Sequence, residues 1–169
     1  LNSVLLREEE SKDCDINWTR AVATPDGWTF VIPNTSQTTS YGYLYNDEIT
    51  STKEASDNFE EVFSLTNKKA HNLKFKSYVA KIPIIDERII LGGNRLFFLE
   101  PLEATAIEAH SFWARRTFDW VVNGITTPSL VTQEILKYIH QIQNFIIWHY
   151  TYGSIYNTPF WKTSRELKV

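Results

Sequence analysis

The chain has 169 residues, which is about the size of one domain and enough to bury a core. Hydrophobic residues make up 43% and aromatic residues 14% of the sequence, which excludes an intrinsically disordered chain. The net charge of −3 offers no basic surface to nucleic acid or to a membrane, and no apolar run approaches the roughly 20 residues of a membrane span. The single cysteine, Cys14, excludes an internal disulfide and fits a reducing compartment, so we expect a cytoplasmic protein.

Residues 1–25 form a polar N-terminal segment that we expect to be irregular, with Glu8–Glu10 as a solvated acidic run. No basic stretch precedes an apolar core, so the opening lacks the pattern of a signal peptide. The sequence contains no Met, and we expect the chain to begin partway through a longer protein.

Two strands and a helix are predicted next. Trp28–Pro33 and Tyr41–Asn46 are rich in aromatic and β-branched residues, and the polar stretch Asn34–Ser40 predicts a hairpin connection between them. Ser51 and Glu54 have capping-box spacing, which predicts the start of a helix. The apolar face expected for this helix consists of Ala55, Phe59, Val62 and Phe63.

Two further strands are predicted before the glycines. Lys74–Ile82 alternates in the manner of a strand, and Glu87–Leu91 is a short apolar run that we expect to be a buried strand. It ends in Gly92-Gly93-Asn94, and a strand, a glycine turn and a following helix resemble one edge of a dinucleotide-binding domain. We therefore interpret residues 26–103 as a sheet-rich region.

Residues 104–169 are predicted to be a helical region. One helix starts near Ala104 and ends at Asn123-Gly124, and its expected face consists of Ile107, Ser111, Ala114, Phe118 and Val121. A second helix opens at Pro128 and runs to about Tyr150, with a face of Val131, Ile135, Ile139, Ile142 and Ile146. We expect residues 153–169 to be irregular. Strands followed by two long helices predict an α+β fold in which helices cover one side of a sheet.

Two places in this sequence suit ligand chemistry. Gly92-Gly93-Asn94 would let the backbone approach a ligand closely, although most adjacent glycines are only turns. In Glu100-Pro101-Leu102-Glu103-Ala104-Thr105, two carboxylates flank a proline before a helix start and follow an apolar run. Partial desolvation there would raise the pKa of a carboxylate and suit it to general acid or base catalysis. The alternative is that the glutamates are helix-start charges favoured by the helix dipole.

At these residues the sequence resembles the flavin-dependent tryptophan halogenases. Gly93–Ile107 resembles the flavin-contacting segment of that family, and Trp28–Pro33 resembles its Trp-x-Trp-x-Ile-Pro signature. Phe145–Tyr150, followed by Pro159–Lys162, resembles the substrate-side helix and loop. The motifs occur in the family's order over residues 26–162, in the style of environmental and phage-encoded members. The resemblance implies an α+β fragment of a larger α/β FAD-binding fold of the halogenase or monooxygenase kind.

The resemblance also implies an activity, namely the FADH2-dependent halogenation of an indole-like or other aromatic substrate. FADH2 comes from a separate flavin reductase, and a flavin hydroperoxide converts chloride or bromide to hypohalous acid. The acid then travels to a lysine beside the substrate. No metal is implied, and the four histidines and Cys14 show no metal-ligand spacing. A homodimer is left open.

The motifs assign expected roles to individual residues. By motif position, Glu103 corresponds to the catalytic glutamate, and Thr105 and Ala106 correspond to the halide site. The expected flavin contacts are Gly93, Asn94, Leu99, Pro101, Ala104 and Ile107. The expected substrate side consists of Trp28, Phe30, His149, Tyr150, Tyr156, Phe160 and Trp161.

The sequence departs from the family pattern at four of these positions. Phe30 replaces the second Trp of the signature, which favours a flavin-dependent aromatic monooxygenase as the alternative activity. Ala104 stands where the family commonly has Ser, and Ala106 stands where it often has Gly, so that a methyl group crowds the expected halide site. Tyr156 replaces an acidic residue that could pair with an ammonium group, so we expect a less polar indole or another aromatic rather than free tryptophan.

Two family motifs do not occur in this sequence. These are the Gly-x-Gly-x-x-Gly fingerprint and the catalytic-lysine motif. We expect both in an upstream FAD-binding half, so that residues 1–169 are one incomplete domain and are inactive alone. A third interpretation is a non-catalytic remnant that acts as a binding or structural module.

Overall fold

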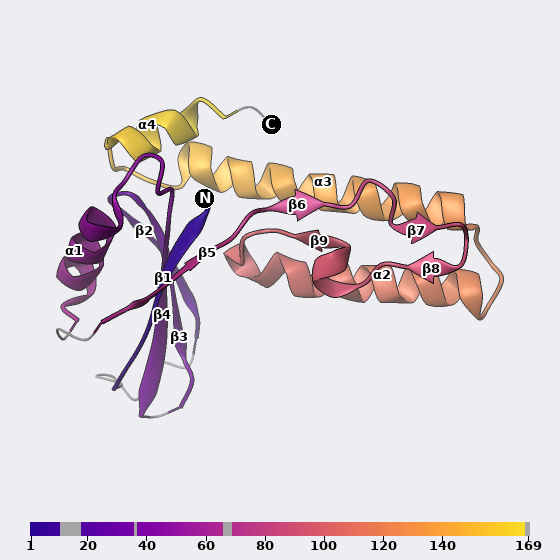
Figure 1. The fold of residues 1–169 in the computed structure, drawn as a ribbon, viewed down its shortest axis with the longest axis horizontal. Helices are drawn as coiled ribbons and strands as arrows, with labels where there is room; N and C mark the ends of the chain where they lie inside the picture. Colours follow the sequence, from indigo (N-terminus) through magenta and orange to yellow (C-terminus); the bar gives the residue numbers. More distant parts are fainter. Residues whose placement is uncertain (11–17, 36, 66–68, 168–169) are drawn as a thin grey trace. The chain divides into compact units, whose positions relative to one another are not determined.

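The computed structural model describes residues 1–10, 18–35, 37–65 and 69–167. The chain divides into two compact units (Figure 1). Unit 1 combines residues 1–75 with residues 147–169, and unit 2 comprises residues 76–146. These limits differ from the boundaries after residues 25 and 103 that we expected from the sequence, because both ends of the chain contribute to unit 1.

Unit 1 is built on a five-stranded antiparallel sheet with the strand order β2-β3-β4-β1-β5. Its strands are β1 (Ser3–Glu10), β2 (Arg20–Thr24), β3 (Gly27–Pro33), β4 (Thr38–Tyr45) and β5 (His71–Lys74). The predicted hairpin is confirmed, because β3 and β4 pair with each other from Gly27 opposite Tyr45 to Pro33 opposite Thr39.

The expectation of an irregular N-terminal segment is wrong for the residues of β1 and β2. β1 lies inside the sheet, where it pairs with β4 on one side and with β5 on the other. Its acidic stretch is accommodated because Arg7 and Glu9, two residues apart, project from the same face and form a buried ion pair of 2.6 Å. Strand pairing on both edges outweighs the low strand preference of glutamate. Cys14 lies outside the described residues.

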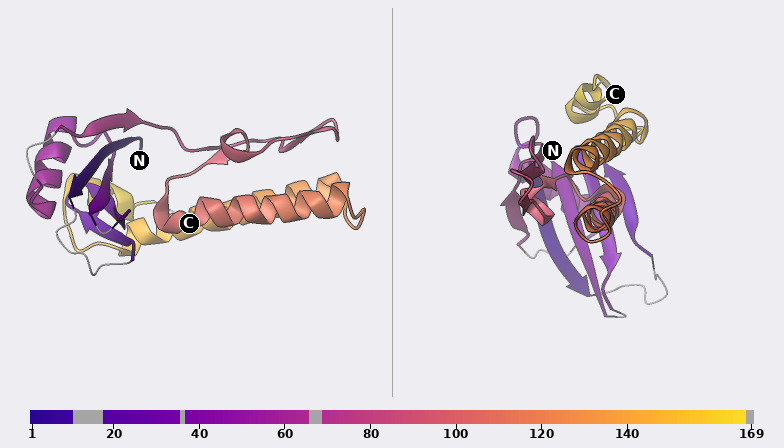
Figure 2. Two further views of the ribbon diagram at one scale, coloured as in Figure 1. Left: turned by 90° about the horizontal axis from the view of Figure 1, so that it is seen from below. Right: turned by 90° about the vertical axis from the view of Figure 1, so that its right-hand side faces the viewer.

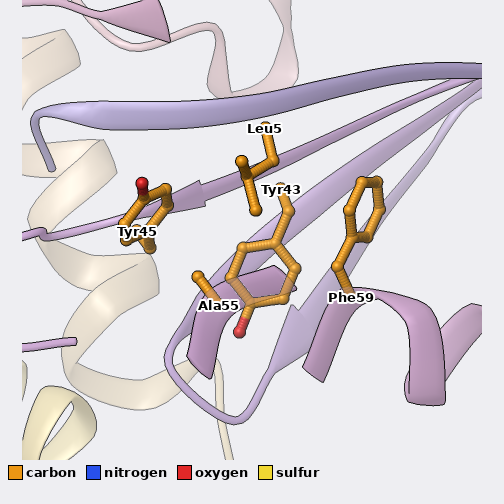
Figure 3. Close-up of a cluster of buried hydrophobic side chains, with 5 residues drawn as sticks. All are labelled: Leu5, Tyr43, Tyr45, Ala55 and Phe59. Carbon is orange, nitrogen blue, oxygen red and sulfur yellow. The ribbon is translucent and has the colours of Figure 1, made fainter. Parts of the chain in front are cut away.

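One face of this sheet is covered by α1 (Thr52–Phe63). The predicted capping box is confirmed, because the Ser51 side chain accepts from the Glu54 N–H and the Glu54 carboxylate accepts from the Ser51 N–H. The helix buries two residues of its predicted apolar face against residues of β1 and β4 (Figure 3). This cluster consists of Leu5, Tyr43, Tyr45, Ala55 and Phe59.

Within unit 1, Tyr150, Thr158 and Trp161 contact the opposite face of the sheet and its β2–β3 turn. The expectation that residues 153–169 are irregular is wrong, because α4 spans Pro159–Arg165. Thr158 caps this helix by accepting from the Trp161 N–H, and Pro159 suits its first turn because that position needs no N–H partner. The Thr158 hydroxyl also donates to the carbonyl of Pro25 in the turn.

Unit 2 consists of two short ribbons and two long helices. Its elements are β6 (Tyr78–Val79), β7 (Ile84–Ile85), β8 (Ile89–Ile90), the 3-10 turn η1 (Gly93–Arg95), β9 (Phe97–Phe98), the 3-10 turn η2 (Leu102–Ala104), α2 (Thr105–Val121) and most of α3 (Pro128–Tyr152). β6 pairs with β9, and β7 pairs with β8, both antiparallel.

Two strand predictions are wrong in this region. Lys74–Ile82 is not one strand, because pairing covers only His71–Lys74 and Tyr78–Val79. β8 is two residues long and exposed rather than buried, since its only partner is β7 in a hairpin. Gly92-Gly93 leads into a 3-10 turn instead of a long helix, so the resemblance to an edge of a dinucleotide-binding domain is not confirmed.

The two long helices were predicted correctly in extent. α2 and α3 run side by side in unit 2 (Figure 2), where Arg116 of α2 makes two hydrogen bonds to the Glu134 carboxylate, of 2.7 and 3.0 Å. The apolar face predicted for α3 is buried. The face predicted for α2 is exposed, and Phe118 retains 55% of its accessible surface, because the buried residues of this helix lie on another side, at Ala109 and Trp113.

Candidate functional site

The candidate residues are distributed over both units. In unit 2 the first of them belong to the glycine segment. Gly93 has a φ of 52°, a left-handed conformation that suits glycine, and a Cβ built at Gly92 or Gly93 would meet no atom within 4 Å. Asn94 is exposed as well. The segment is anchored at its base, where the Trp113 indole N–H of α2 donates to the Leu91 carbonyl over 2.7 Å. Its backbone is therefore open to a ligand while the strand before it is fixed.

The two carboxylates that flank Pro101 lie in different environments. Glu100 keeps only 5% of its accessible surface, whereas Glu103 is exposed. The desolvated carboxylate suggested by the apolar surroundings is therefore Glu100. Glu103, the residue that corresponds to the family's glutamate, projects from the surface of unit 2 and is open to a reacting partner.

The backbone at Glu103 and Ala104 is strained. Their φ values are 52° and 53°, so two consecutive non-glycine residues adopt the left-handed conformation, at roughly 1–2 kcal/mol each. Such strain persists only where neighbouring structure enforces it, and it is concentrated at functional sites. Leu102 is buried directly before the pair, and its carbonyl accepts from both the N–H and the hydroxyl of Thr105.

The start of α2 is suited to an anion. A left-handed residue followed by a right-handed one, here Ala104 and Thr105, turns successive N–H groups towards one side. Thr105 already donates its N–H and its hydroxyl to Leu102. The N–H groups of Ala106 and Ile107 have no acceptor within the helix, because they belong to its first turn. These two groups, rather than the Thr105 hydroxyl, are the donors that could bind a halide at the positive end of the helix dipole.

The side chains around this helix start offer an apolar surface. Ile107 retains 70% of its accessible surface, and Ala104 and Pro101 are exposed beside it in the sequence. Leu99, in contrast, keeps only 6% and is buried. The exposed apolar surface at the start of α2 would suit a flat, largely apolar ring, whereas the buried Leu99 has little surface to offer such a ring.

His110 lies in the next turn of α2 and was not singled out from the sequence. Its ring stacks on Phe97 of β9, with the ring centres 4.4 Å apart and the planes at 22°. Burial lowers the pKa of His110 below the usual 6.5, because the charged form is desolvated. The sequence offered one signal for His110. It lies four positions after Ala106, and residues four apart lie on one face of a helix.

The second group lies in unit 1, where four of the predicted substrate-side residues meet. The Trp28 indole N–H of β3 donates to the Tyr150 hydroxyl of α3 over 2.8 Å, and both residues are buried. The Tyr150 ring lies 6.1 Å from the rings of both Phe160 and Trp161. The Trp161 indole N–H in turn donates to the Thr24 carbonyl of β2. These contacts join the sheet to α3 and α4 through one aromatic cluster.

Phe30 lies beside this cluster and is half-buried. Its ring packs edge-on against Trp28, with ring centres 6.3 Å apart. It also lies directly over Gly42 of the neighbouring strand, where an added Cβ would come within 2.0 Å of the ring. Sequence reasoning missed Gly42, although a glycine inside a strand is a known sign of close approach by a neighbouring group.

The two remaining substrate-side residues lie outside the buried cluster. His149 is half-buried at the end of α3, with its ring edge-on to Trp148 at 5.1 Å. Tyr156 is half-buried in the loop before α4, and its carbonyl accepts from the Arg165 guanidinium over 2.6 Å. Arg165 also binds the Ser154 carbonyl, so this cation fixes the loop that carries Tyr156.

The residues that the structure describes contain no group of three or more His, Cys, Asp or Glu side chains arranged to hold a metal ion. Among the same residues, no helix has both the length and the apolarity to cross a bilayer.

Comparison with known proteins relates this geometry to one family. The sequence model described as Tryptophan halogenase matches residues 2–169. Tryptophan 7-halogenase RebH of Lentzea aerocolonigenes is 26% identical over 179 residues, which cover 100% of this chain and 33% of RebH. Tryptophan 6-halogenase ThaL of Streptomyces albogriseolus is 26% identical over 162 residues, which cover 90% of this chain and 29% of ThaL.

Solved structures show the same fold. Xcc4156, a flavin-dependent halogenase from Xanthomonas campestris, matches with a TM-score of 0.82 and 22% identity over 99% of this chain and 34% of that protein. BrvH, a flavin-dependent halogenase from Brevundimonas sp. BAL3, matches with a TM-score of 0.81 and 20% identity over 99% of this chain and 35% of that protein. The α+β architecture is thereby confirmed as part of a halogenase fold, and the chain spans about a third of the length of the relatives that it matches.

Proposed function

Because the chain belongs to the tryptophan halogenase family, we propose that it supplies the halide side and part of the substrate side of a flavin-dependent halogenase. The observation that carries this proposal is the start of α2. There an exposed carboxylate, Glu103, stands in a strained backbone next to helix N–H groups that suit an anion. The proposal needs a carboxylate and a halide site in this part of the protein, and the residues proposed for these roles, Glu103 and Ala106, are three positions apart in the sequence.

The flavin would be held by the open glycine segment and the apolar start of α2. Gly93 and Asn94 would contact it through exposed backbone, and Pro101, Ala104 and Ile107 through exposed apolar side chains. When bound as FADH2, supplied by a separate flavin reductase, it would provide the two electrons that convert dioxygen and a halide to water and hypohalous acid.

The chain's own residues act on the halide and on the aromatic ring. The N–H groups of Ala106 and Ile107 bind chloride or bromide, and the methyl group of Ala106 narrows the space around it. In the halogenation step a carbon–halogen bond forms and the ring loses a proton, while the oxygen–halogen bond of hypohalous acid breaks and its oxygen leaves as hydroxide, which takes up a proton to become water. We assign to Glu103 the acceptance of the proton lost from the ring, because its carboxylate is exposed and its backbone is held in place.

The substrate side favours an aromatic that is less polar than free tryptophan. Phe30 offers a half-buried ring beside the buried Trp28. Tyr156 stands where an acidic residue would pair with the ammonium group of an amino acid. We therefore propose an indole-like or other aromatic substrate, although RebH and ThaL are named for halogenating tryptophan. Equal turnover of free tryptophan and indole would contradict this substrate class.

The reaction is tested with the longest form of the protein that its gene encodes. The protein is incubated with FAD, a flavin reductase, NADH, bromide, oxygen and indole, and the product is examined by mass spectrometry. A bromine isotope doublet is the expected result. A mass gain of one oxygen would instead assign the monooxygenase activity that Phe30 favours, and an unchanged indole would assign a non-catalytic binding module.

The role of Glu103 is tested by Glu103→Gln. The substitution removes the proton acceptor but keeps the shape of the side chain, so kcat should fall roughly a hundredfold with little change in KM. Glu87→Gln is the matched control, because Glu87 is also an exposed glutamate with a left-handed φ, of 53°, but lies in the β7–β8 turn. Equal losses in the two variants would remove Glu103 from the catalytic machinery.

A further inference from the structure

The left-handed pair Glu103–Ala104 requires a cause. Hydrogen bonds inside the loop are few: the Ala104 N–H donates to the Pro101 carbonyl over a long 3.4 Å, and Thr105 donates to Leu102. The strain of two consecutive left-handed residues exceeds what the single long hydrogen bond contributes. A conformation of this kind is kept only when the two ends of the segment are fixed.

The two ends of this segment meet in one contact. Phe97 belongs to β9 and keeps only 1% of its accessible surface, and Val79 of β6 is its strand partner. His110 belongs to α2, and its ring lies flat on Phe97 at 4.4 Å. The stack therefore closes the chain from Phe97 to His110 between a paired strand and a helix, with Glu103 and Ala104 inside the closed segment.

The chemistry of His110 suits this contact. Its Nδ1 atom is buried without a hydrogen-bond partner. A proton placed there would leave an N–H buried and unsatisfied, so the neutral ring carries its proton on Nε2. A neutral, desolvated imidazole stacks on an apolar ring without the cost of burying a charge. The residue is thus held as an uncharged aromatic group within the candidate site.

We propose that His110 is a positioning residue for Glu103, which acts by stacking on Phe97 and thereby holding Glu103 and Ala104 in the left-handed conformation. The structural half of this proposal concerns the 169-residue chain itself. The catalytic half rests on the proposed function, because it concerns the carboxylate of Glu103.

The structural half is tested by amide hydrogen exchange on the chain. His110→Ala removes the stack, so the Thr105 N–H, which binds the Leu102 carbonyl, should exchange roughly tenfold faster. His110→Phe keeps an aromatic ring on Phe97 and should restore the protection. His140→Ala is the matched control, because His140 is an exposed histidine of α3. Unchanged exchange in His110→Ala, or loss in His110→Phe equal to that in His110→Ala, would overturn the proposal.

A double-mutant cycle separates the stack from a general loss of stability. Phe97→Leu removes the other ring of the stack, and Phe97→Leu combined with His110→Ala should speed Thr105 exchange no more than either change alone. Fully additive effects would show that the two rings act independently. The amides of β3 and β4 in unit 1 serve as an internal reference, since a variant that simply unfolds would lose protection there too.

The catalytic half is tested in the longest encoded form of the protein, with the indole bromination assay. His110→Ala should lower kcat roughly tenfold while KM for indole stays unchanged, and His110→Phe should recover most of the rate. If amide exchange responds as expected but neither the variants nor the unmodified protein brominate indole, the structural role of His110 is supported and the proposed function is contradicted. If the protein is active and His110→Ala leaves kcat unchanged, the positioning role fails and the proposed function stands.

Discussion

At the scale of single residues, the backbone around Glu103 matters as much as its carboxylate. A residue with a φ of 52° directs its side chain differently from one in a helix or a strand, so the left-handed conformation decides where the carboxylate of Glu103 lies. Ala104 has the same steric cost from its left-handed φ, but its side chain carries no functional group. Two residues are therefore strained, and the proposed function depends on the orientation of one of them, Glu103.

This strain predicts an increase in stability for Ala104→Gly. Glycine adopts a left-handed φ without a clash, so the free energy of unfolding should rise by about 1 kcal/mol in urea denaturation. The same substitution at Ala114, exposed in the middle of α2, should lower it by about 1 kcal/mol, because glycine weakens a helix. Destabilisation at Ala104 would argue against the left-handed conformation.

The lowered pKa of His110 predicts that the stability of the chain depends on pH. Its folded-state pKa lies below the usual 6.5, so folding favours the neutral ring. This contribution to the free energy of unfolding is fully present above the pKa that His110 has in the unfolded state. It is lost as the pH falls through the lower pKa of the folded state. Thermal unfolding measured between about pH 7 and about pH 5 should show this loss, and His110→Phe should reduce it. A loss in His110→Phe as large as in the unmodified chain would contradict this origin of the pH dependence.

At the scale of elements, a hydrogen bond between two side chains far apart in the sequence links β3 to α3. The Trp28 indole N–H and the Tyr150 hydroxyl form a buried hydrogen bond of 2.8 Å. Their rings also belong to the aromatic cluster that contains α4. The bond therefore fixes the end of a long helix to the sheet that carries Phe30.

Tyr150→Phe should destabilise the chain by about 1–3 kcal/mol, because it leaves the indole N–H of Trp28 buried without an acceptor. The midpoint of urea unfolding measures the effect. Tyr152→Phe is the control, since the Tyr152 side chain is 72% exposed and its hydroxyl remains in water. A loss of similar size at both positions would mean that the hydrogen bond contributes little.

The elements that the sequence predicted share a local cause. The β3–β4 hairpin, α1 with its capping box, and the extents of α2 and α3 depend on side chains close together in the chain. β1 and α4 were missed because their stability comes from distant partners: β1 pairs with β4 and β5, and Trp161 of α4 binds Thr24 of β2. Local composition contains no signal for such contacts.

Like the fold, the candidate site was predicted only in part from the sequence. The motif identified Glu103 and the start of α2 by position, but not the left-handed backbone or the stack on His110. The helical period of α2 predicted an apolar face, and that face is exposed at Phe118 and Ile107. Periodicity shows which side chains share a face, whereas burial depends on what packs against them.

At the scale of the whole molecule, the two units differ in how their backbones are held. Unit 1 has a five-stranded sheet with a buried cluster under α1, whereas the ribbons of unit 2 pair over two residues each. Of the four residues of β7 and β8, only Ile84 is buried, so the hairpin has few buried contacts to protect its hydrogen bonds.

Native-state hydrogen exchange should therefore be uneven. We expect the slowest amides in β3, β4 and β1, and the fastest among the ordered strands in β7 and β8, because local opening costs less where fewer contacts break. The measurement uses the intact chain under native conditions. Equal protection of the β7–β8 hairpin and the centre of the sheet would contradict the difference between the units.

The strand order has a consequence for how unit 1 is made. Among the strands of this sheet β1 is synthesised first, yet the sheet places it between β4 and β5, which are synthesised later. Until β4 emerges, the backbone of β1 has no sheet partner and is open to other chains. The pairing of β1 with β4 joins residues far apart in the sequence, so β1 cannot join the sheet before the β3–β4 hairpin has been made. The unit is completed only when α4, at the other end of the sequence, has been synthesised.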